Sequence, residues 1–267
     1  MMLWRIEWSR TLRQKESYGF LFTWMVTLVL LGGLGQALPV ATAYTNVNAT
    51  LLTIIGLVLP LFVMLTTALQ WGGERESKRL RLLTTYPLSM FRLVWMRYTA
   101  FLATQALIVT LAYALSSFFV SMPLKTWVVL WAYSLGLIAY GAAFGTFVGV
   151  IGRNRLQAVL MSFLVWTVLI LLWPTVLVSV IAWIPYGVQA EAMVGALFLN
   201  GFELLRVWVS AVLAAPDLFG AIYETFIGWL DGPVGTAVVG ATIIGVILSM
   251  LGAAAWWLRR EGRHDST

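Results

Sequence analysis

The residues that could do chemistry are few in this sequence, and the densest group of charged ones lies in one short stretch. Residues 71–97 read WGGERESKRLRLLTTYPLSMFRLVWMR, within a chain that is 61% apolar and 10% charged. The charged side chains of this stretch are Glu74, Arg75, Glu76, Lys78, Arg79, Arg81, Arg92 and Arg97. Acids and bases so close together form ion pairs, contact anionic surfaces or receive a partner protein. Which of these applies depends on the elements on either side.

Catalytic and metal-binding chemistry has few candidates here. The chain has no cysteine, and its one histidine, His264, lies in the basic C-terminal stretch. Thiolate sites, histidine-activated serines and H-E-x-x-H metal sites are therefore excluded. The ten methionines are scattered, and no G-x-x-x-x-G-K-[ST] phosphate loop occurs. We expect no catalytic residue, no metal site and no cofactor in this chain.

Long charge-free windows predict a polytopic membrane protein of the all-α class. A spanning helix needs about 20 mostly apolar residues, and six windows satisfy this: 19–38, 51–71, 98–121, 127–151, 157–184 and 234–258. The polar, proline-bearing stretch 38–50 separates the first two, and Pro174 is expected to kink the fifth. The predicted organisation is an interfacial helix at 1–18, a six-span domain at 19–258 and a basic tail at 259–267.

The distribution of basic residues predicts the orientation. Fifteen of the 17 Lys and Arg residues fall on the side of the termini and of the charged stretch, and only Lys125 and Arg206 fall on the other. By the positive-inside rule, both termini are cytoplasmic and the protein is a multi-pass protein of the cell membrane. The net charge of +6 therefore reflects topology rather than nucleic-acid binding. Ala41-Thr42-Ala43 resembles a signal-peptide cleavage site, but the preceding apolar run is long, and we expect an uncleaved first span.

The predicted spans carry no charge in their cores. Ion-driven transporters generally keep such a residue at the coupling site, so this class is disfavoured. The polar side chains inside the spans are uncharged. A transport path lined by them and by aromatic residues suits an apolar or amphiphilic substrate. Because the chain has neither an ion-coupling site nor a phosphate loop, any energy-driven activity requires a separate ATPase on the cytoplasmic face.

The charged stretch itself is predicted to form a helical elbow. We expect a helix that begins at Glu74 and Glu76 and carries bases farther along, in accord with the helix dipole. Pro87 breaks it, and Ser89 caps a second helix that leads into the third span. Such an elbow can transmit motion from a cytosolic partner, although a plain positive-inside loop fits the same pattern.

This stretch resembles the coupling helix of membrane subunits of type-2 ABC exporters, which carry E-R-E-x-G-T-L-E-x-L-L-x-x-P-x-S before a basic residue. The matching positions are Glu74, Glu76, Leu80, Leu83, Pro87, Leu88 and Arg97. The resemblance implies docking of a cytosolic ABC ATPase that binds ATP and Mg, six spans, a cytoplasmic N-terminal helix, and a homodimer or a paired permease. Lys78-Arg79 and Arg81 depart from the pattern and make the docking face unusually basic, which suits an acidic groove or anionic lipid.

The segment 185–233 is expected to lie outside as short amphipathic helices on or in the outer leaflet. By the same resemblance it would form a lid, for which the candidate residues are Asn200, Glu203, Arg206 and Asp217. Its LNGFELLR is similar to L-N-P-x-x-x-x-R of permeases related to nitrous-oxide-reductase maturation, with glycine in place of proline. That similarity implies a second function, in which ATP-driven motion passes to an extracytoplasmic copper or sulfur partner.

Gly141, Gly145 and Gly149 form two successive G-x-x-x-G steps in the fourth predicted span. Small residues at this spacing let another helix approach closely. Packing within the chain is the favoured reading, and a dimer seam is the alternative. The function expected overall is the permease subunit of an ATP-driven exporter. A self-contained transporter or lipid enzyme is the third possibility and would be active without any ATPase.

Overall fold

The fold is helical throughout the part of the chain that the structure describes. The computed structural model describes residues 2–12, 15–37, 41–78, 89–213, 228–230 and 232–264, which contain no β-strand. Its helices in chain order are α1 (Met2–Leu12), α2 (Lys15–Ala37), α3 (Ala41–Glu76), α5 (Met90–Ser116), α6 (Leu124–Ile151), α7 (Arg155–Trp166), the π-helix η1 (Thr167–Leu172), α8 (Trp173–Ile181), the 3-10 turn η2 (Tyr186–Val188), α9 (Gln189–Leu199), α10 (Gly201–Val212) and α12 (Pro233–His264). The predicted all-α class is confirmed for these residues.

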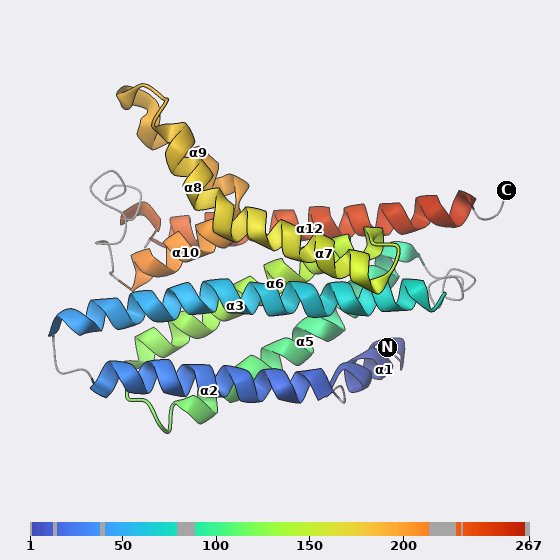
Figure 1. Cartoon of the computed structure of the whole chain (residues 1–267), viewed down its shortest axis with the longest axis horizontal. Helices are drawn as coiled ribbons and strands as arrows, with labels where there is room; N and C mark the ends of the chain where they lie inside the picture. Colours follow the sequence, from blue (N-terminus) through green and yellow to red (C-terminus); the bar gives the residue numbers. More distant parts are fainter. Residues whose placement is uncertain are drawn as a thin grey trace.

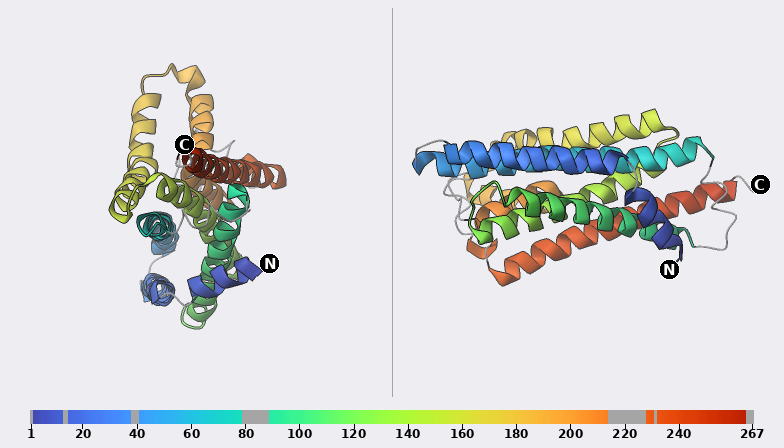
Figure 2. Two further views of the ribbon diagram at one scale, coloured as in Figure 1. Left: turned by 90° about the vertical axis from the view of Figure 1, so that its right-hand side faces the viewer. Right: turned by 90° about the horizontal axis from the view of Figure 1, so that it is seen from below.

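The long helices α2, α3, α5, α6 and α12 run side by side along the longest axis of the molecule (Figure 1). Helix α6 lies in the middle, since 67% of its apolar window is buried within the chain. Its side chains Tyr133, Leu137 and Ile138 are fully buried and form the centre of the core. Figure 2 shows from two further directions that α1 lies across one end of this bundle, at an angle to the long helices.

Both ends of the described chain lie at that same end of the bundle, which we call the basic end (Figure 1). It carries the following described basic side chains: Arg5, Arg75, Lys78, Arg92, Arg97, Arg153, Arg155, Arg259 and Arg260. The opposite end carries α9 and α10 (Figure 1). The grouping of bases that the sequence predicts is therefore present in three dimensions.

Within the described residues, five helices are long and apolar enough to cross a membrane: Thr50–Glu76, Met90–Ser116, Leu124–Ile151, Arg155–Ile181 and Pro233–Glu261. A sixth crossing is reached if Glu191–Leu199 and Gly201–Val212, bent by 117°, count as one span. The predicted first span lies in α2, whose described apolar stretch Tyr18–Leu30 is shorter. The exact count of six, with the first crossing at 19–38, stays a prediction.

Three helix boundaries in the structure differ from the predicted ones. Helix α3 already begins at Ala41, so most of the polar stretch 38–50 is helical rather than a break. Nothing in ATAYTNVNAT forbids this, because it contains neither proline nor glycine. At the other end of the chain α12 continues to His264, so the predicted tail at 259–267 is helical over its first part. The predicted interfacial helix at 1–18 corresponds to the shorter α1, after which α2 starts at Lys15.

The fifth predicted span is interrupted where the sequence places Pro174. A π-helical turn, η1, precedes the proline, and the Trp173 N–H bonds to the Val168 carbonyl instead of the Leu169 carbonyl. Proline lacks an N–H and disfavours a regular turn before it, and π-turns mark such interruptions. Beyond the interruption α8 and α9 leave the bundle as an antiparallel pair (Figure 1). The irregularity expected at Pro174 is therefore present.

The three glycines of α6 at G-x-x-x-G spacing, Gly141, Gly145 and Gly149, face α3. A Cβ on Gly145 would come within 2.7 Å of the Met64 carbonyl oxygen, and one on Gly149 within 2.8 Å of the Trp71 Cβ. At Gly141 the nearest atom is at 3.5 Å, which is ordinary contact. The two helices approach closely because glycine leaves room for backbone against backbone. All three glycines serve packing within the chain, as the favoured reading of the sequence predicts.

Gly149→Ala is expected to lower the stability of the protein by about 1–3 kcal/mol, since the added methyl group overpacks the α3–α6 contact. Gly245→Ala is the matched control, because nothing lies within 4 Å of a Cβ at Gly245 in α12. Alanine there is expected to raise stability by up to ~1 kcal/mol through helix propensity. Thermal unfolding in detergent measures both changes. Equal shifts of the melting temperature for the two variants would contradict the close approach.

Candidate functional site

The charged run Glu74-Arg75-Glu76 forms the last turn of α3 and not, as predicted, the start of a new helix. The helix ends at Glu76, and the following turn contains Lys78 with a positive φ of 56°. In an α-helix consecutive side chains point about 100° apart. The three residues therefore face three different directions, and each contacts a different set of neighbouring helices.

Glu74 faces α5 and α1. Its carboxylate accepts from Nη1 of Arg97 in α5, and Nη2 of Arg97 lies 3.4 Å from Oε1 of Glu7 in α1. The Arg97 guanidinium also lies over the indole of Trp71, 4.9 Å from the ring centroid. Glu74 and Arg97 are largely buried, with side-chain exposures of 9% and 12%. Removal of either partner would leave a buried charge without compensation.

Arg75 faces α6 and α12. Its guanidinium donates through Nη1 to the Val150 carbonyl, in the last turn of α6, and through Nη2 to the Glu261 carboxylate of α12. A free carbonyl at a helix C-terminus carries partial negative charge. Arg75 therefore satisfies that carbonyl while it joins the ends of two helices to α3.

Glu76 faces α7. Its Oε2 accepts from the backbone N–H of Arg155 at 3.1 Å and lies 3.9 Å from the Arg155 Nε. Asn154 caps the same helix by accepting from the Gln157 N–H at 2.8 Å. A carboxylate at the N-terminus of α7 is favourable because that end of the helix dipole is positive.

These pairings explain why acids are tolerated at the end of α3. Carboxylates near a helix C-terminus are disfavoured by the dipole, so Glu74 and Glu76 require partners from other helices. The described contacts of three consecutive residues join α3 to α5, α6, α7 and α12, and Arg97 of α5 extends them to Glu7 of α1. We call this set of contacts the α3 junction.

The remaining predicted elbow residues Leu80, Leu83, Pro87 and Leu88 lie outside the described residues. The predicted cap Ser89 is confirmed, since its hydroxyl accepts from the Arg92 N–H at 3.3 Å. Sequence reasoning missed Glu7, Arg155 and Glu261 as partners in the α3 junction. No local signal identifies them, because Glu261 lies 186 positions from its partner Arg75.

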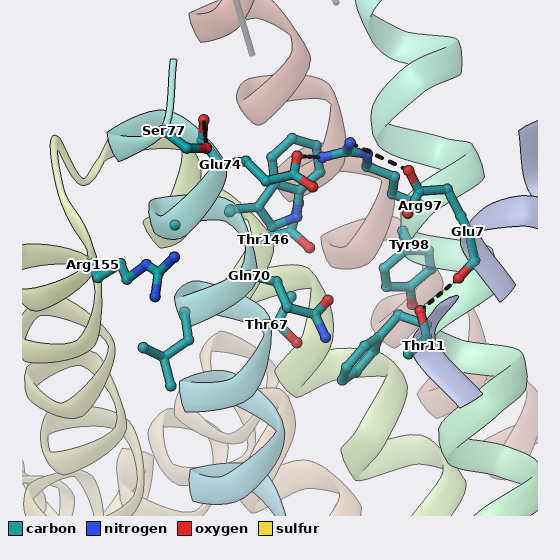
Figure 3. A pocket seen from close by; sticks show the side chains of 14 residues that line it. Glu7, Thr11, Thr67, Gln70, Glu74, Ser77, Arg97, Tyr98, Thr146 and Arg155 are labelled. Atoms are coloured by element: carbon teal, nitrogen blue, oxygen red, sulfur yellow. Dashed lines mark hydrogen bonds and ion pairs between the residues drawn. The ribbon is translucent and has the colours of Figure 1, made fainter. Parts of the chain in front are cut away.

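A cavity of about 630 Å³ lies beside the α3 junction (Figure 3). Side chains of α1, α3, α5, α6 and α7 line it: Glu7, Thr11, Thr67, Leu69, Gln70, Trp71, Gly73, Glu74, Ser77, Arg97, Tyr98, Phe101, Thr146 and Arg155. The lining combines acids, bases and hydroxyls with an aromatic wall. Such a combination suits a ligand that has both a polar and an apolar part.

At the opposite end Asn200 joins α10 to the π-helix. Its Oδ1 accepts from the Phe202 N–H at 3.1 Å and caps α10, and its Nδ2 donates to the Leu169 carbonyl at 2.5 Å. In a π-turn that carbonyl would bond to the N–H five residues on, which is Pro174 and has none. Asn200, fully buried, supplies the missing donor.

The glycine after Asn200 is required by its surroundings. The Gly201 N–H donates to the Tyr140 hydroxyl at 3.2 Å, and a Cβ at this position would lie 2.6 Å from the Tyr140 ring and 2.7 Å from Ile243. Proline, present in the motif that LNGFELLR resembles, would lack the donor and collide with the ring. The departure from that motif therefore has a local physical reason.

Helix α10 packs its apolar face into the core of the described chain, and its expected place on or in the outer leaflet stays a prediction. Phe202, Leu204 and Val207 are buried, and Leu205 packs where Gly136 of α6 leaves room. Glu203 and Arg206 form an ion pair at 2.5 Å on the same helix, with the Glu203 side chain 12% exposed. The fourth lid candidate, Asp217, lies outside the described residues.

Among the described residues no group of three or more His, Cys, Asp or Glu side chains could hold a metal ion. Neither protein-family models nor curated proteins give a match to this sequence. The fold defines the class of the protein: an all-helical, membrane-embedded protein with five to six long apolar helices in the described part of the chain.

Proposed function

We propose that this chain is the membrane subunit of a type-2 ABC transporter. In this proposal a separate cytosolic ATPase binds ATP and Mg and docks on residues 74–97, and the chain moves an apolar or amphiphilic substrate across the cell membrane. The observation that carries the proposal is the α3 junction, in which Glu74, Arg75 and Glu76 each contact a different set of helices. These are the residues that resemble the start of a coupling helix.

The arrangement supports a mechanical role for this end of the chain. By the positive-inside rule the basic end faces the cytoplasm, with both termini. A push on the segment after Glu76 acts directly on the end of α3, and ion pairs carry it to α5 through Arg97 and to α7 through Arg155. Packed helices move as rigid units rather than deform continuously. Motion of α3 would therefore displace several spans together.

The proposed transporter contains two membrane subunits, either two copies of this chain or this chain and a paired permease. Support comes from the fourth of the five candidate spans in the described residues, Arg155–Ile181, of whose apolar window only 6% is buried within the chain. The other four candidate spans bury 28–67% of theirs. A second subunit or lipid covers this face in the membrane.

Leu83→Asp is expected to abolish co-purification with the ATPase, because by resemblance Leu83 belongs to the apolar docking face. The measurement is affinity purification of the tagged chain with the candidate ATPase, followed by the rate of ATP hydrolysis in lipid nanodiscs. Lys125→Asp is the control, since Lys125 is exposed at the opposite end of the bundle. Assembly and hydrolysis unchanged in Leu83→Asp would refute ATPase docking at this segment.

A second candidate function is a mechanical relay to a partner on the outer side, such as a copper or sulfur maturation protein. The α8–α9 pair favours it, because the pair projects from the bundle at the end opposite the basic end (Figure 1). At its tip Trp183 is 90% exposed. ATP hydrolysis without movement of any substrate would select this function, and activity without an ATPase would refute both.

A further inference from the structure

The cavity beside the α3 junction is built like a ligand site. Its volume of about 630 Å³ lies within the range of about 300–1,000 Å³ that small-molecule sites occupy. Figure 3 shows Arg155 entering from α7 on one side and Arg97 from α5 on the other, with Glu74 and Thr146 between them. Five helices contribute side chains, so the space belongs to the folded chain and to no single loop.

Two buried polar atoms of the lining have no hydrogen-bond partner among the described residues: the Thr146 Oγ1 and the Arg97 Nε. Thr146 is fully buried in α6. Thr67, which also lines the cavity, instead bonds back to the Val63 carbonyl at 2.7 Å. An arginine nitrogen can only donate, and a buried donor without an acceptor is costly. The missing partner must therefore present an acceptor oxygen.

The charges indicate that this acceptor is anionic. Glu7 and Glu74 are engaged with the Arg97 Nη groups. The Arg155 side chain crosses over Gly73, where an added Cβ would lie 2.8 Å from the Arg155 Nε. The Arg155 side chain is 63% exposed. The nearby side chain of Lys78 is exposed as well and adds positive charge. An oxyanion is the partner that accepts from several such donors at once.

The rest of the lining is apolar and aromatic. Trp71, Phe101 and Tyr98 form part of the wall, and all three are buried at 4% exposure each. At the depth of a bilayer interface, aromatic rings of this kind contact the upper part of lipid chains. The site therefore combines donors for an oxyanion with a surface for an apolar stem.

We propose that this cavity binds the phosphate-bearing headgroup of an amphiphile. The phosphate oxygens accept hydrogen bonds from the Arg97 Nε, the Thr146 hydroxyl and the Arg155 guanidinium, and the stem of the molecule lies against Trp71 and Phe101. Anionic lipids of the cytoplasmic leaflet, which basic clusters attract, are one source of this group, and free phosphate is the other. Binding is a property of this chain alone and holds whether or not it works with an ATPase.

The test is calorimetric titration of the purified chain in detergent with dihexanoyl phosphatidylglycerol. Thr146→Val is expected to weaken binding about tenfold while the melting temperature of the ligand-free protein stays equal or rises, because an unpaired buried hydroxyl is removed. Arg155→Gln, at an exposed position, is expected to weaken binding at least tenfold. Arg153→Gln, two positions away and outside the cavity lining, is the control and should bind as the parent does.

Inorganic phosphate and the phosphate-free amphiphile hexyl glucoside complete the experiment. Phosphate that competes only at concentrations far above those of the lipid identifies a lipid headgroup as the ligand. Phosphate that competes at concentrations similar to those of the lipid identifies free phosphate as the ligand, and this result also supports the oxyanion site. The proposal is overturned if hexyl glucoside binds as tightly as the phospholipid, if the phospholipid does not bind, or if Thr146→Val and Arg155→Gln bind like Arg153→Gln.

Discussion

Arg97→Gln is expected to lower the free energy of unfolding by about 3–5 kcal/mol, the usual cost of removing one partner of a buried ion pair. Glutamine cannot neutralise the buried carboxylate of Glu74, and it releases the contact with Glu7 in α1. The ring of Trp71 loses its cation at the same time. Chemical unfolding of the purified chain in detergent measures the change.

Two further variants separate the ion pair from a general effect of charge loss. Glu74→Gln in the Arg97→Gln background removes the uncompensated carboxylate and is expected to recover part of the lost free energy of unfolding. The double variant should therefore be more stable than the sum of the two single changes predicts. Arg259→Gln, at an exposed position of α12, is expected to change stability by at most about 0.5 kcal/mol. If Arg97→Gln cost no more than Arg259→Gln, the pair would have no structural role.

Asn200→Leu is expected to destabilise the protein by about 2–5 kcal/mol, since it removes two hydrogen bonds at a fully buried position. The Leu169 carbonyl loses its donor, and α10 loses its N-cap, which alone contributes about 1 kcal/mol. Because α10 lies in the core, the loss should extend to the α6 and α12 contacts. The measurement is thermal and chemical unfolding in the same detergent.

The decisive control for Asn200 is Pro174→Ala. Alanine restores an N–H five residues after Leu169, so the carbonyl no longer depends on the Asn200 amide. Asn200→Leu should therefore cost less in the Pro174→Ala background than in the parent, by about the value of one buried hydrogen bond, ~1 kcal/mol or more. Additive costs of the two changes would show that Asn200 and the interrupted helix are independent.

Much of the fold follows from the sequence, because hydropathy and local chemistry act over short stretches. Six apolar windows predict the long helices, since a chain in a bilayer must satisfy its backbone hydrogen bonds within each segment. Ser89 is recognisable as a cap from its position before an apolar run, and the structure confirms it. Pro174 predicts an interruption that its missing N–H makes unavoidable. The glycine spacing of α6 predicts a close helix contact, which is with α3.

The tertiary structure decided which residues meet. From the sequence, Glu74 and Glu76 suit the start of a helix, yet α3 continues through them, because arginines from α5 and α7 offset the unfavourable helix dipole. Likewise the sequence predicts α10 only as a short amphipathic helix on or in the outer leaflet, and the Asn200 cap and the Gly201 contact with Tyr140 determine how its apolar face enters the core. The physical reason is the same in both places. Ion pairs and hydrogen bonds between residues far apart in the chain produce no periodic pattern in the sequence. The packing of the helices alone determines which of these residues meet.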